Sequence, residues 1–225
     1  MEEITKEQLQ KKIGDRKNSV FIEDPAVPEK FRAKLSDYFR SGYDRGHQVP
    51  LHEQQKTNAQ VPAADAKLSQ EAMNETFYLT NMCPQVSPVH LMRLTLGRRW
   101  LQQGLYNCFI YLTNLDWAHF EDFCRRLTQK YANVQIYTGP LYLPRQYPDG
   151  KWRVSYEVIG SPPSVAVPTH FFKVIVAEPT ENSSHVAVGA FVLPNQEINN
   201  STALTTFLTP IEAVERYSLT PLNVL

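Results

Sequence analysis

The spacing of apolar residues along the chain predicts a mixture of helices and strands. Over residues 117–131, apolar side chains recur at steps of three and four, while charged side chains occupy the remaining faces. This periodicity predicts an amphipathic helix. Shorter helices are predicted over residues 5–13, 31–39 and 210–216, although residues 31–39 also fit a loop.

Several other segments favour β-strands, because they alternate polar with aromatic or β-branched residues or form short apolar runs. These segments are residues 75–82, 134–137, 152–159, 171–177 and 186–193. Residues 43–48 should form the end of a further strand, which presents His47. The pattern therefore indicates a sheet built from strands that are not consecutive in the chain, with helices packed against it.

Two stretches do not fit this pattern. Residues 49–60 are polar and have no apolar period, which is typical of a loop or of disorder. Residues 87–115 contain no acidic residue but carry several basic ones, followed by an apolar run at 105–112 that is too short to span a bilayer. One interpretation of the second stretch is a basic arm that faces nucleic acid.

Composition narrows the classes of function. A chain of 225 residues is most simply one domain with a sizeable core. The formal net charge is zero, so binding of a polyanion must rest on a local basic surface. Cys83, Cys108 and Cys124 form no CxxC pair and are expected to be reduced core residues, not a thiolate metal site. No secretory signal or presequence is visible, and the acidic start is expected to lead directly into a helix at Thr5.

Residues 41–48 hold the densest candidate chemistry. Arg45 offers a permanently charged planar fork suited to phosphate oxygens, and His47 can act as a base near neutral pH. Gly46 between them allows close approach of the backbone and unusual dihedral angles. The alternative is a surface turn in which Asp44 pairs with Arg45 and His47 is solvated.

Three blocks in order, residues 41–48, 76–85 and 117–121, resemble the DNA/RNA non-specific endonucleases that have a ββα-metal (His-Me) finger. The mitochondrial endonuclease G branch of that family is the most similar. Further matching segments lie at residues 137–144 and 166–173, and at the predicted helix near the C-terminus. The resemblance implies an α+β fold with a mostly antiparallel sheet and packed helices, formed by a single domain over residues 1–225.

The resemblance also implies roles for individual residues. His47 corresponds to the general base of phosphodiester hydrolysis, and Arg45 to the arginine that supports the phosphate. Glu121 corresponds to the glutamate that orients the water network around the metal, or is a solvated helix charge. Asn81 is a candidate substrate-binding residue, although ordering of the adjoining turn is the more favoured role. The family's metal, usually Mg²⁺ with Mn²⁺ as an alternative, is held by one asparagine and several waters.

The chain departs from the family at that metal ligand. The asparagine is expected four residues before Trp117, where this chain has Thr113, whereas Asn114 stands three residues before it. One position rotates a helical side chain by about 100°. Asn114 is therefore the candidate metal ligand only if the segment begins irregularly. Otherwise the metal site is damaged, and the alternative function is a non-catalytic nucleic-acid-binding pseudo-nuclease.

The remaining expectations also rest on the resemblance. The implied partners are DNA and RNA, a homodimer is expected, and no integral membrane segment is predicted. The location is mitochondrial. Residues 49–60 and about 87–114 are interpreted as insertions, because family members bridge both places with few residues. The family's targeting segment and opening strand pair are expected to be missing, so that the domain is truncated at its N-terminus.

Overall fold

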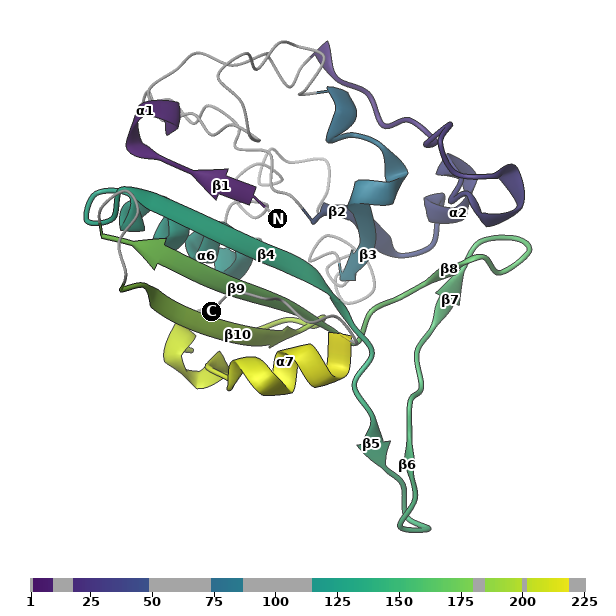
Figure 1. Ribbon diagram of the computed structural model, residues 1–225. Helices are drawn as coiled ribbons and strands as arrows, with labels where there is room; N and C mark the ends of the chain where they lie inside the picture. The colour runs from purple at the N-terminus through teal and green to yellow at the C-terminus, as the bar shows by residue number, and fades with distance from the viewer. Residues whose placement is uncertain are drawn as a thin grey trace, which may run out of the picture.

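The computed structural model describes residues 2–9, 18–48, 74–86, 115–179, 185–199 and 202–218. Its centre is a four-stranded antiparallel sheet of order β1-β4-β9-β10, called the main sheet below (Figure 1). Its strands are β1 (Glu2–Ile4), β4 (Asn133–Leu141), β9 (His170–Glu178) and β10 (Ala187–Pro194). Helix α6 (Leu115–Leu127) covers one face, and helix α7 (Ile211–Ser218) covers the other.

The alternation of side chains along the strands explains these two layers. Val134 and Ile136 of β4 point to the face where Phe120 and Cys124 of α6 pack. Phe172 and Val174 of β9 belong to the opposite core, where Val214 of α7 packs. Residues 171–177 of β9 are all buried, because this strand has a partner on each side and a helix on each face.

A second unit carries the residues that resemble the family's finger. Strands β2 (Tyr43–His47) and β3 (Met82–Val86) pair antiparallel and form the β2–β3 ribbon. Around it lie α2 (Leu35–Tyr38) and the 3-10 helices η2 (Glu29–Phe31) and η3 (Leu79–Asn81). A separate core that includes Tyr38, Leu79 and Met82 joins this unit to Ile159 and Val167.

Between β4 and β9 the chain runs out into a long extended arm (Figure 1). The arm contains β5 (Arg145–Gln146), β6 (Trp152–Arg153), β7 (Val158–Ile159) and β8 (Val165–Ala166). Its return path towards β8 meets the second core through Ile159. Two further short elements complete the described structure: α1 (Lys6–Leu9) and η5 (Leu204–Phe207). In the described part of the chain, no helix is long and apolar enough to cross a membrane.

The predicted fold class is confirmed, as are the elements with the strongest patterns. The helix predicted over residues 117–131 is α6, and the strands predicted over residues 171–177 and 186–193 are β9 and β10. The strand predicted at residues 134–137 is longer than expected and continues as β4 to Leu141. The helix near the C-terminus is α7, which begins directly after Pro210.

The strand predicted over residues 75–82 is wrong. Asn81 explains the difference, because its side-chain Nδ2 donates to Thr76 O at 2.9 Å and its backbone N–H donates to Tyr78 O at 2.9 Å. These local hydrogen bonds coil the segment into η3. The strand β3 begins only at Met82, where the predicted one ended.

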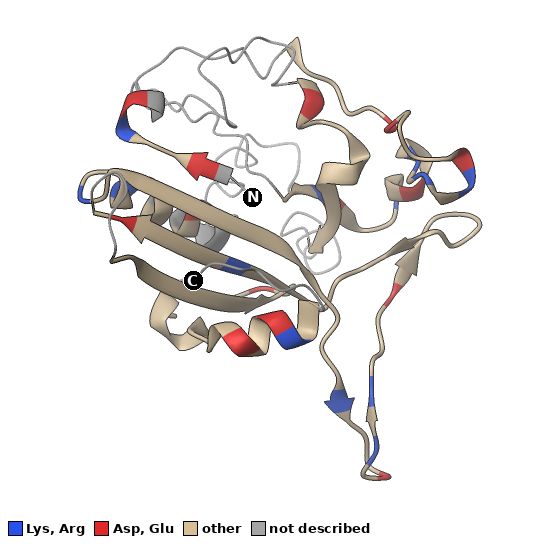
Figure 2. Cartoon of the chain, viewed as in Figure 1, with Lys and Arg blue, Asp and Glu red and all other residues tan. Residues whose placement is uncertain are grey.

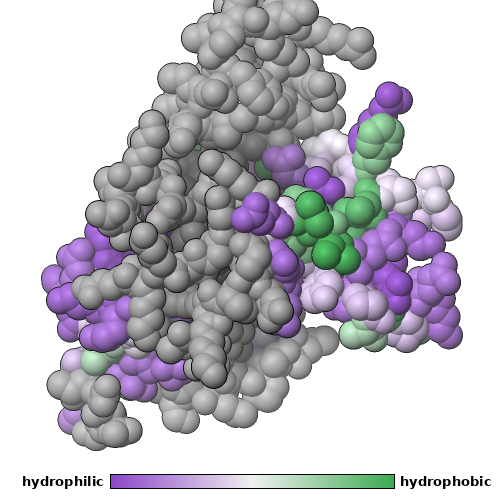
Figure 3. Space-filling view, turned by 90° about the horizontal axis from the view of Figure 1, so that it is seen from above, coloured by the Kyte–Doolittle hydropathy of each residue, from purple (hydrophilic) through white to green (hydrophobic). Residues whose placement is uncertain are grey.

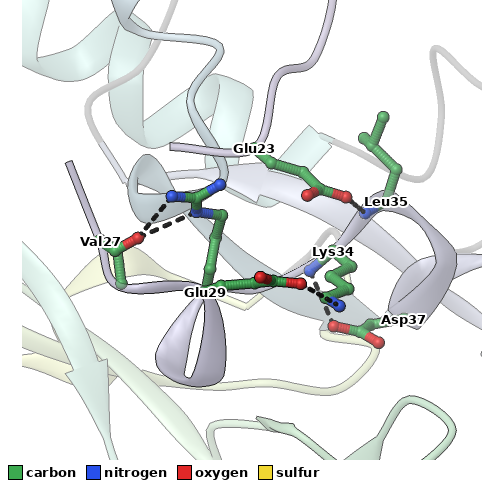
Figure 4. A network of polar contacts seen from close by, with 7 residues as sticks. Glu23, Val27, Glu29, Lys34, Leu35 and Asp37 are labelled. Carbon is green, nitrogen blue, oxygen red and sulfur yellow. Dashed lines mark hydrogen bonds and ion pairs between the residues drawn. The ribbon is translucent and has the colours of Figure 1, made fainter. Parts of the chain in front are cut away.

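The helix predicted over residues 31–39 is limited to α2. Asp37 accepts from the backbone N–H of Lys34 at 2.8 Å and Glu23 accepts from that of Leu35 at 3.2 Å, so polar side chains set the helix start (Figure 4). Before it, Arg32 Nε and Nη2 donate to Val27 O at 3.0 and 2.7 Å. These contacts hold Arg32 in an extended conformation, which separates η2 from α2.

Two further differences concern strands. The strand predicted over residues 152–159 is split into β6 and β7, and its apolar side chains before Ile159 stay on the surface, with Trp152 66% exposed. At the N-terminus, Glu2–Ile4 forms β1 where no strand was predicted, because Ile4 is buried against β4. Of the helix predicted over residues 5–13, Lys6–Leu9 is helical and residues 10–17 lie outside the described part.

Residues 49–60 and 87–114, interpreted as insertions, also lie outside the described residues. That interpretation therefore stays a prediction.

Candidate functional site

The β2–β3 ribbon brings Arg45 and His47 together. They are two residues apart on β2, so their side chains leave the same face of the strand. Both side chains contact Phe21. The Arg45 guanidinium carbon lies 4.1 Å from the Phe21 ring centroid, and the His47 ring lies 5.8 Å from it. The predicted pair therefore shares one surface, and Arg45 is stacked on an aromatic ring rather than placed in a loose turn.

Phe77 completes the surroundings of the imidazole. Its ring meets His47 edge-on at 5.1 Å, and Phe21 also packs edge-on against Phe77 at 5.1 Å. The backbone holds the two phenylalanines in register, because Ile22 N–H donates to Phe77 O at 3.1 Å and Leu79 N–H donates to Ile22 O at 2.9 Å. The rings of Phe21 and Phe77, which come from different segments, therefore limit the orientation of the His47 ring.

Gly46 is required by close approach. A Cβ built on Gly46 would overlap the Gln85 side-chain oxygen and lie 3.0 Å from Gln85 Cβ. Glycines with positive φ in the described residues are Gly42, Gly150 and Gly160. Gly46 thus lies close to Gln85 and is not among the glycines with positive φ, while close approach of a substrate to this turn stays a prediction.

Asn81 supports the ribbon through both its side chain and its backbone. Besides the bond to Thr76, its carbonyl oxygen accepts from the backbone N–H of Gln48 at 2.9 Å, one residue beyond His47. These contacts match the turn-ordering role of Asn81, and its candidate role in substrate binding stays a prediction.

The other candidate residues belong to α6 or lie outside the described part. Glu121 is half-buried on α6, directly after Phe120, whose ring packs in the core of the main sheet. The side chains of Trp117 and His119 are not described, and Thr113 and Asn114 precede the described helix. The structure therefore places Arg45 and His47 together on β2, Asn81 at the end of η3 directly before β3, and Glu121 on α6.

Two aromatic residues of the site were missed by sequence reasoning. Phe21 lies in a segment without periodicity, and Phe77 was interpreted as one position of a strand. Neither position carries a spacing that indicates contact with Arg45 or His47. The structure alone shows that Phe77 is buried, with only 3% of the residue exposed, although its segment is not a strand.

The thiol beside the site is not a nucleophile. Burial raises the pKa of Cys83 on β3 to about 12, so the thiol is protonated at neutral pH. Burial also raises the pKa of Tyr38, which packs close by. Cys124 is buried in the core of the main sheet, and Cys108 lies outside the described residues. The prediction of a core thiol fits Cys124, whereas Cys83 is half-buried on β3.

His170, the other histidine at a strand end, is not placed with this group. It begins β9, and its Nδ1 lies 3.0 Å from Thr169 Oγ1. Burial lowers the pKa of His170, which favours the neutral ring. The contact with Thr169 and the neutral ring together indicate a structural role for His170 at the start of β9.

The side chains of the described residues limit the kind of metal site that they can form. Among the described residues, no group of three or more His, Cys, Asp or Glu side chains could hold a metal ion. A metal ion held by only one or two protein ligands would complete its coordination with waters, as is common for Mg²⁺, which dehydrates reluctantly.

Positive charge gathers at the tip of the arm, although the whole chain is neutral. Arg145 and Arg153 flank the ring of Tyr147 at 4.9 and 5.0 Å, and Lys151 lies beside them (blue in Figure 2). Asp149 forms an ion pair with Arg153. Apolar surface occurs elsewhere: Figure 3 shows a compact apolar patch bordered by polar residues on the upper side of the molecule.

Comparison with known proteins supplies the family. The profile of the "DNA/RNA non-specific endonuclease" family matches residues 1–224. The chain belongs to this family. Its fold agrees with that membership, because the crystal structure of an EndoG/EndoGI complex matches with a TM-score of 0.73 and 37% identity, covering 99% of this chain and 76% of that one.

Family members from several organisms are similar along the chain. A mitochondrial nuclease of Saccharomyces cerevisiae is 54% identical over 96% of this chain and 56% of its own length. Nuclease 1 of Schizosaccharomyces pombe is 51% identical over 96% and 57%. Human endonuclease G is 38% identical over 91% and 56%.

The chain thus spans little more than half the length of these relatives. All three are named as mitochondrial, which confirms the location predicted from the resemblance.

Proposed function

We propose that the protein is a metal-dependent, sequence-nonspecific endonuclease that hydrolyses phosphodiester bonds of DNA and RNA. The observation that carries this proposal is the placement of Arg45 and His47 on one face of the β2–β3 ribbon, both against Phe21. A permanent cation beside a titratable base is the minimum that hydrolysis of a phosphodiester needs. Family membership and the names of the relatives support the same class of reaction.

The proposed roles follow from the chemistry of each group. His47 takes the proton of the attacking water, and Arg45 stabilises the negative charge that builds on the phosphate oxygens. Glu121 orients the water network around the metal. Mg²⁺, or Mn²⁺ in its place, would be held by Asn114 and waters, and when bound it stabilises the departing 3′ oxygen.

The arm tip supports binding of a polyanion. A local cluster of Arg145, Lys151 and Arg153 can attract phosphates even though the net charge of the chain is zero.

We also propose a homodimer, which light scattering of the purified protein tests directly.

The function is tested with supercoiled plasmid and with RNA. Purified protein should nick and then linearise the plasmid, and should degrade RNA, in Mg²⁺ or Mn²⁺ but not in excess EDTA. The alternative is the non-catalytic pseudo-nuclease, which would shift DNA in a gel and cut neither substrate at any Mg²⁺ concentration.

The ring of Phe21 should increase the affinity for substrate. Removing its ring in Phe21→Ala takes away the surface that orients the Arg45 guanidinium. A cation–π contact of about 1 kcal/mol corresponds to a rise of about fivefold in KM for a DNA duplex. Phe21→Leu, which keeps apolar volume without a π face, is the matched variant and should give the same direction. An unchanged KM in both variants would show that the stacking does not position Arg45 for substrate.

A further inference from the structure

Asn195 links two parts of the molecule that are distant in sequence. It lies directly after β10, yet its side chain reaches β3. Asn195 Oδ1 accepts from the backbone N–H of Val86 at 3.0 Å, and Asn195 Nδ2 donates to Pro84 O at 3.0 Å. The same Nδ2 also donates to Pro168 O at 2.9 Å. One amide side chain therefore makes three hydrogen bonds, all to backbone.

The geometry of these bonds is that of a neighbouring strand. Pro84 and Val86 are two residues apart, so their backbone groups point to the same edge of β3. That edge faces away from β2, because the two-stranded ribbon has β2 on its other side. Proline is tolerated there, since the N–H that it lacks is not needed by β2. The Asn195 amide completes the outer edge of β3 as a peptide group would.

The strand that Asn195 holds is β3, which pairs with β2, the strand that carries Arg45 and His47. Pro84 stands directly opposite Arg45, and Val86 stands opposite Tyr43. A displacement of β3 at this edge is therefore passed to Arg45, and through the strand to His47. The Pro84 and Pro168 side chains are almost fully buried, so water has little room to replace the amide.

The backbone of Asn195 is fixed to the main sheet. Its N–H donates to Thr169 O at 2.9 Å, and Thr169 N–H donates to Leu141 O at 3.0 Å. Leu141 and Thr169 mark the ends of β4 and β9 that meet at the root of the arm. Asn195 thus connects the ribbon that bears Arg45 and His47 to the sheet on which α6 and Glu121 lie.

We propose that Asn195 is a positioning residue for hydrolysis, whose side-chain amide sets the β2–β3 ribbon relative to the main sheet and α6. This inference rests on the proposed nuclease function, because its consequence is a rate. The reaction needs groups from both bodies in one arrangement, and small displacements of such groups are costly. Asn195 touches backbone at every described contact, so it acts through the ribbon and not on the substrate.

The test compares Asn195→Ala and Asn195→Asp with the wild-type protein, well below the unfolding temperature of each. Asn195→Asp keeps the size and the acceptor for Val86, but it turns an oxygen towards the carbonyls of Pro84 and Pro168. Both variants should lose about tenfold or more in kcat, in line with the cost of misplaced catalytic groups. KM and the affinity for DNA in EDTA should stay within about threefold, because the phosphate-binding side chains remain.

Asn133→Ala is the matched control. Asn133 begins β4, roughly 26 Å along the strand from Leu141 at about 3.3 Å per residue. Its replacement changes a half-buried asparagine of the same sheet without touching the junction. Full kcat in folded Asn195→Ala and Asn195→Asp, or an equal loss in Asn133→Ala, would overturn the positioning role.

Hydrogen exchange separates this inference from the proposed function. The Val86 amide is bonded to Asn195, so it should exchange faster in Asn195→Ala while the amides of β9 keep their protection. Unchanged protection at Val86 would refute the inference whether or not the protein cuts. A different result is that the wild type cuts no substrate, while the Val86 amide loses protection in Asn195→Ala. The structural link through Asn195 would then hold. The proposed function would fail, and the catalytic role of Asn195 would fail with it.

Discussion

His47→Ala should reduce cleavage of plasmid DNA about a thousandfold while leaving DNA binding in EDTA largely intact, in the range expected for loss of a general base. The separation of effects follows from the site. His47 offers the proton acceptor, whereas Arg45, stacked on Phe21, offers charge to the phosphate. Removing the imidazole leaves the edge-on contact between Phe21 and Phe77 in place, so the surface that carries Arg45 should persist.

The control for this variant is His185→Ala. His185 is an exposed histidine just before β10, and its removal changes the histidine count without altering the ribbon. It should cut at the wild-type rate. Near-normal cleavage by His47→Ala would remove His47 from the role of base.

Long periodic segments could be predicted from the sequence because their own side chains determine them. Helix α6 repeats apolar residues along one face over several turns, and β9 is apolar along its buried length except at Lys173. The shared placement of Arg45 and His47 could also be predicted, because it depends only on their positions along one strand. Two positions on one strand share a face wherever that strand is placed.

Short elements depend on partners elsewhere, which a local pattern does not contain. Glu2–Ile4 has one apolar residue that is buried, and it is a strand because β4 lies beside it. The arm shows the opposite case. Trp152 and Val158 alternate with polar residues as in a half-buried strand, yet both are exposed because no sheet face covers them. Alternation indicates an extended chain, but burial is decided by topology.

The supporting residues of the site were out of reach for a related reason. Phe21 meets His47 across 26 positions of chain, and Asn195 meets Val86 across 109. Such contacts arise only when the fold brings the segments together. An amide that bonds three backbone groups has no sequence signature of its own, since asparagine after a strand is equally typical of an ordinary turn.

The metal ligand gives the prediction with the second large effect. Replacing residues 87–114 by a short linker whose penultimate residue is asparagine, four residues before Trp117, should raise Mg²⁺-dependent cleavage about ten- to a hundredfold, as expected when metal binding is improved by one ligand. The reason is the spacing of the ligand. Asn114 stands three residues before Trp117, and on a helix one position corresponds to about 100° of rotation. A site with a single protein ligand has no second side chain to compensate for that rotation.

The matched control is the same linker with alanine in place of its asparagine, which separates the new ligand from removal of the segment itself. The Mg²⁺ concentration for half-maximal rate should fall only in the linker that carries asparagine. DNA binding in EDTA should be similar for the two linkers, because Arg45 and the arm tip are common to both. If the unaltered chain already cuts as fast as the asparagine linker, Asn114 or Thr113 serves the metal. In that case Asn114→Ala should abolish Mg²⁺ activation if Asn114 is the ligand, and Thr113→Ala should do so if Thr113 is.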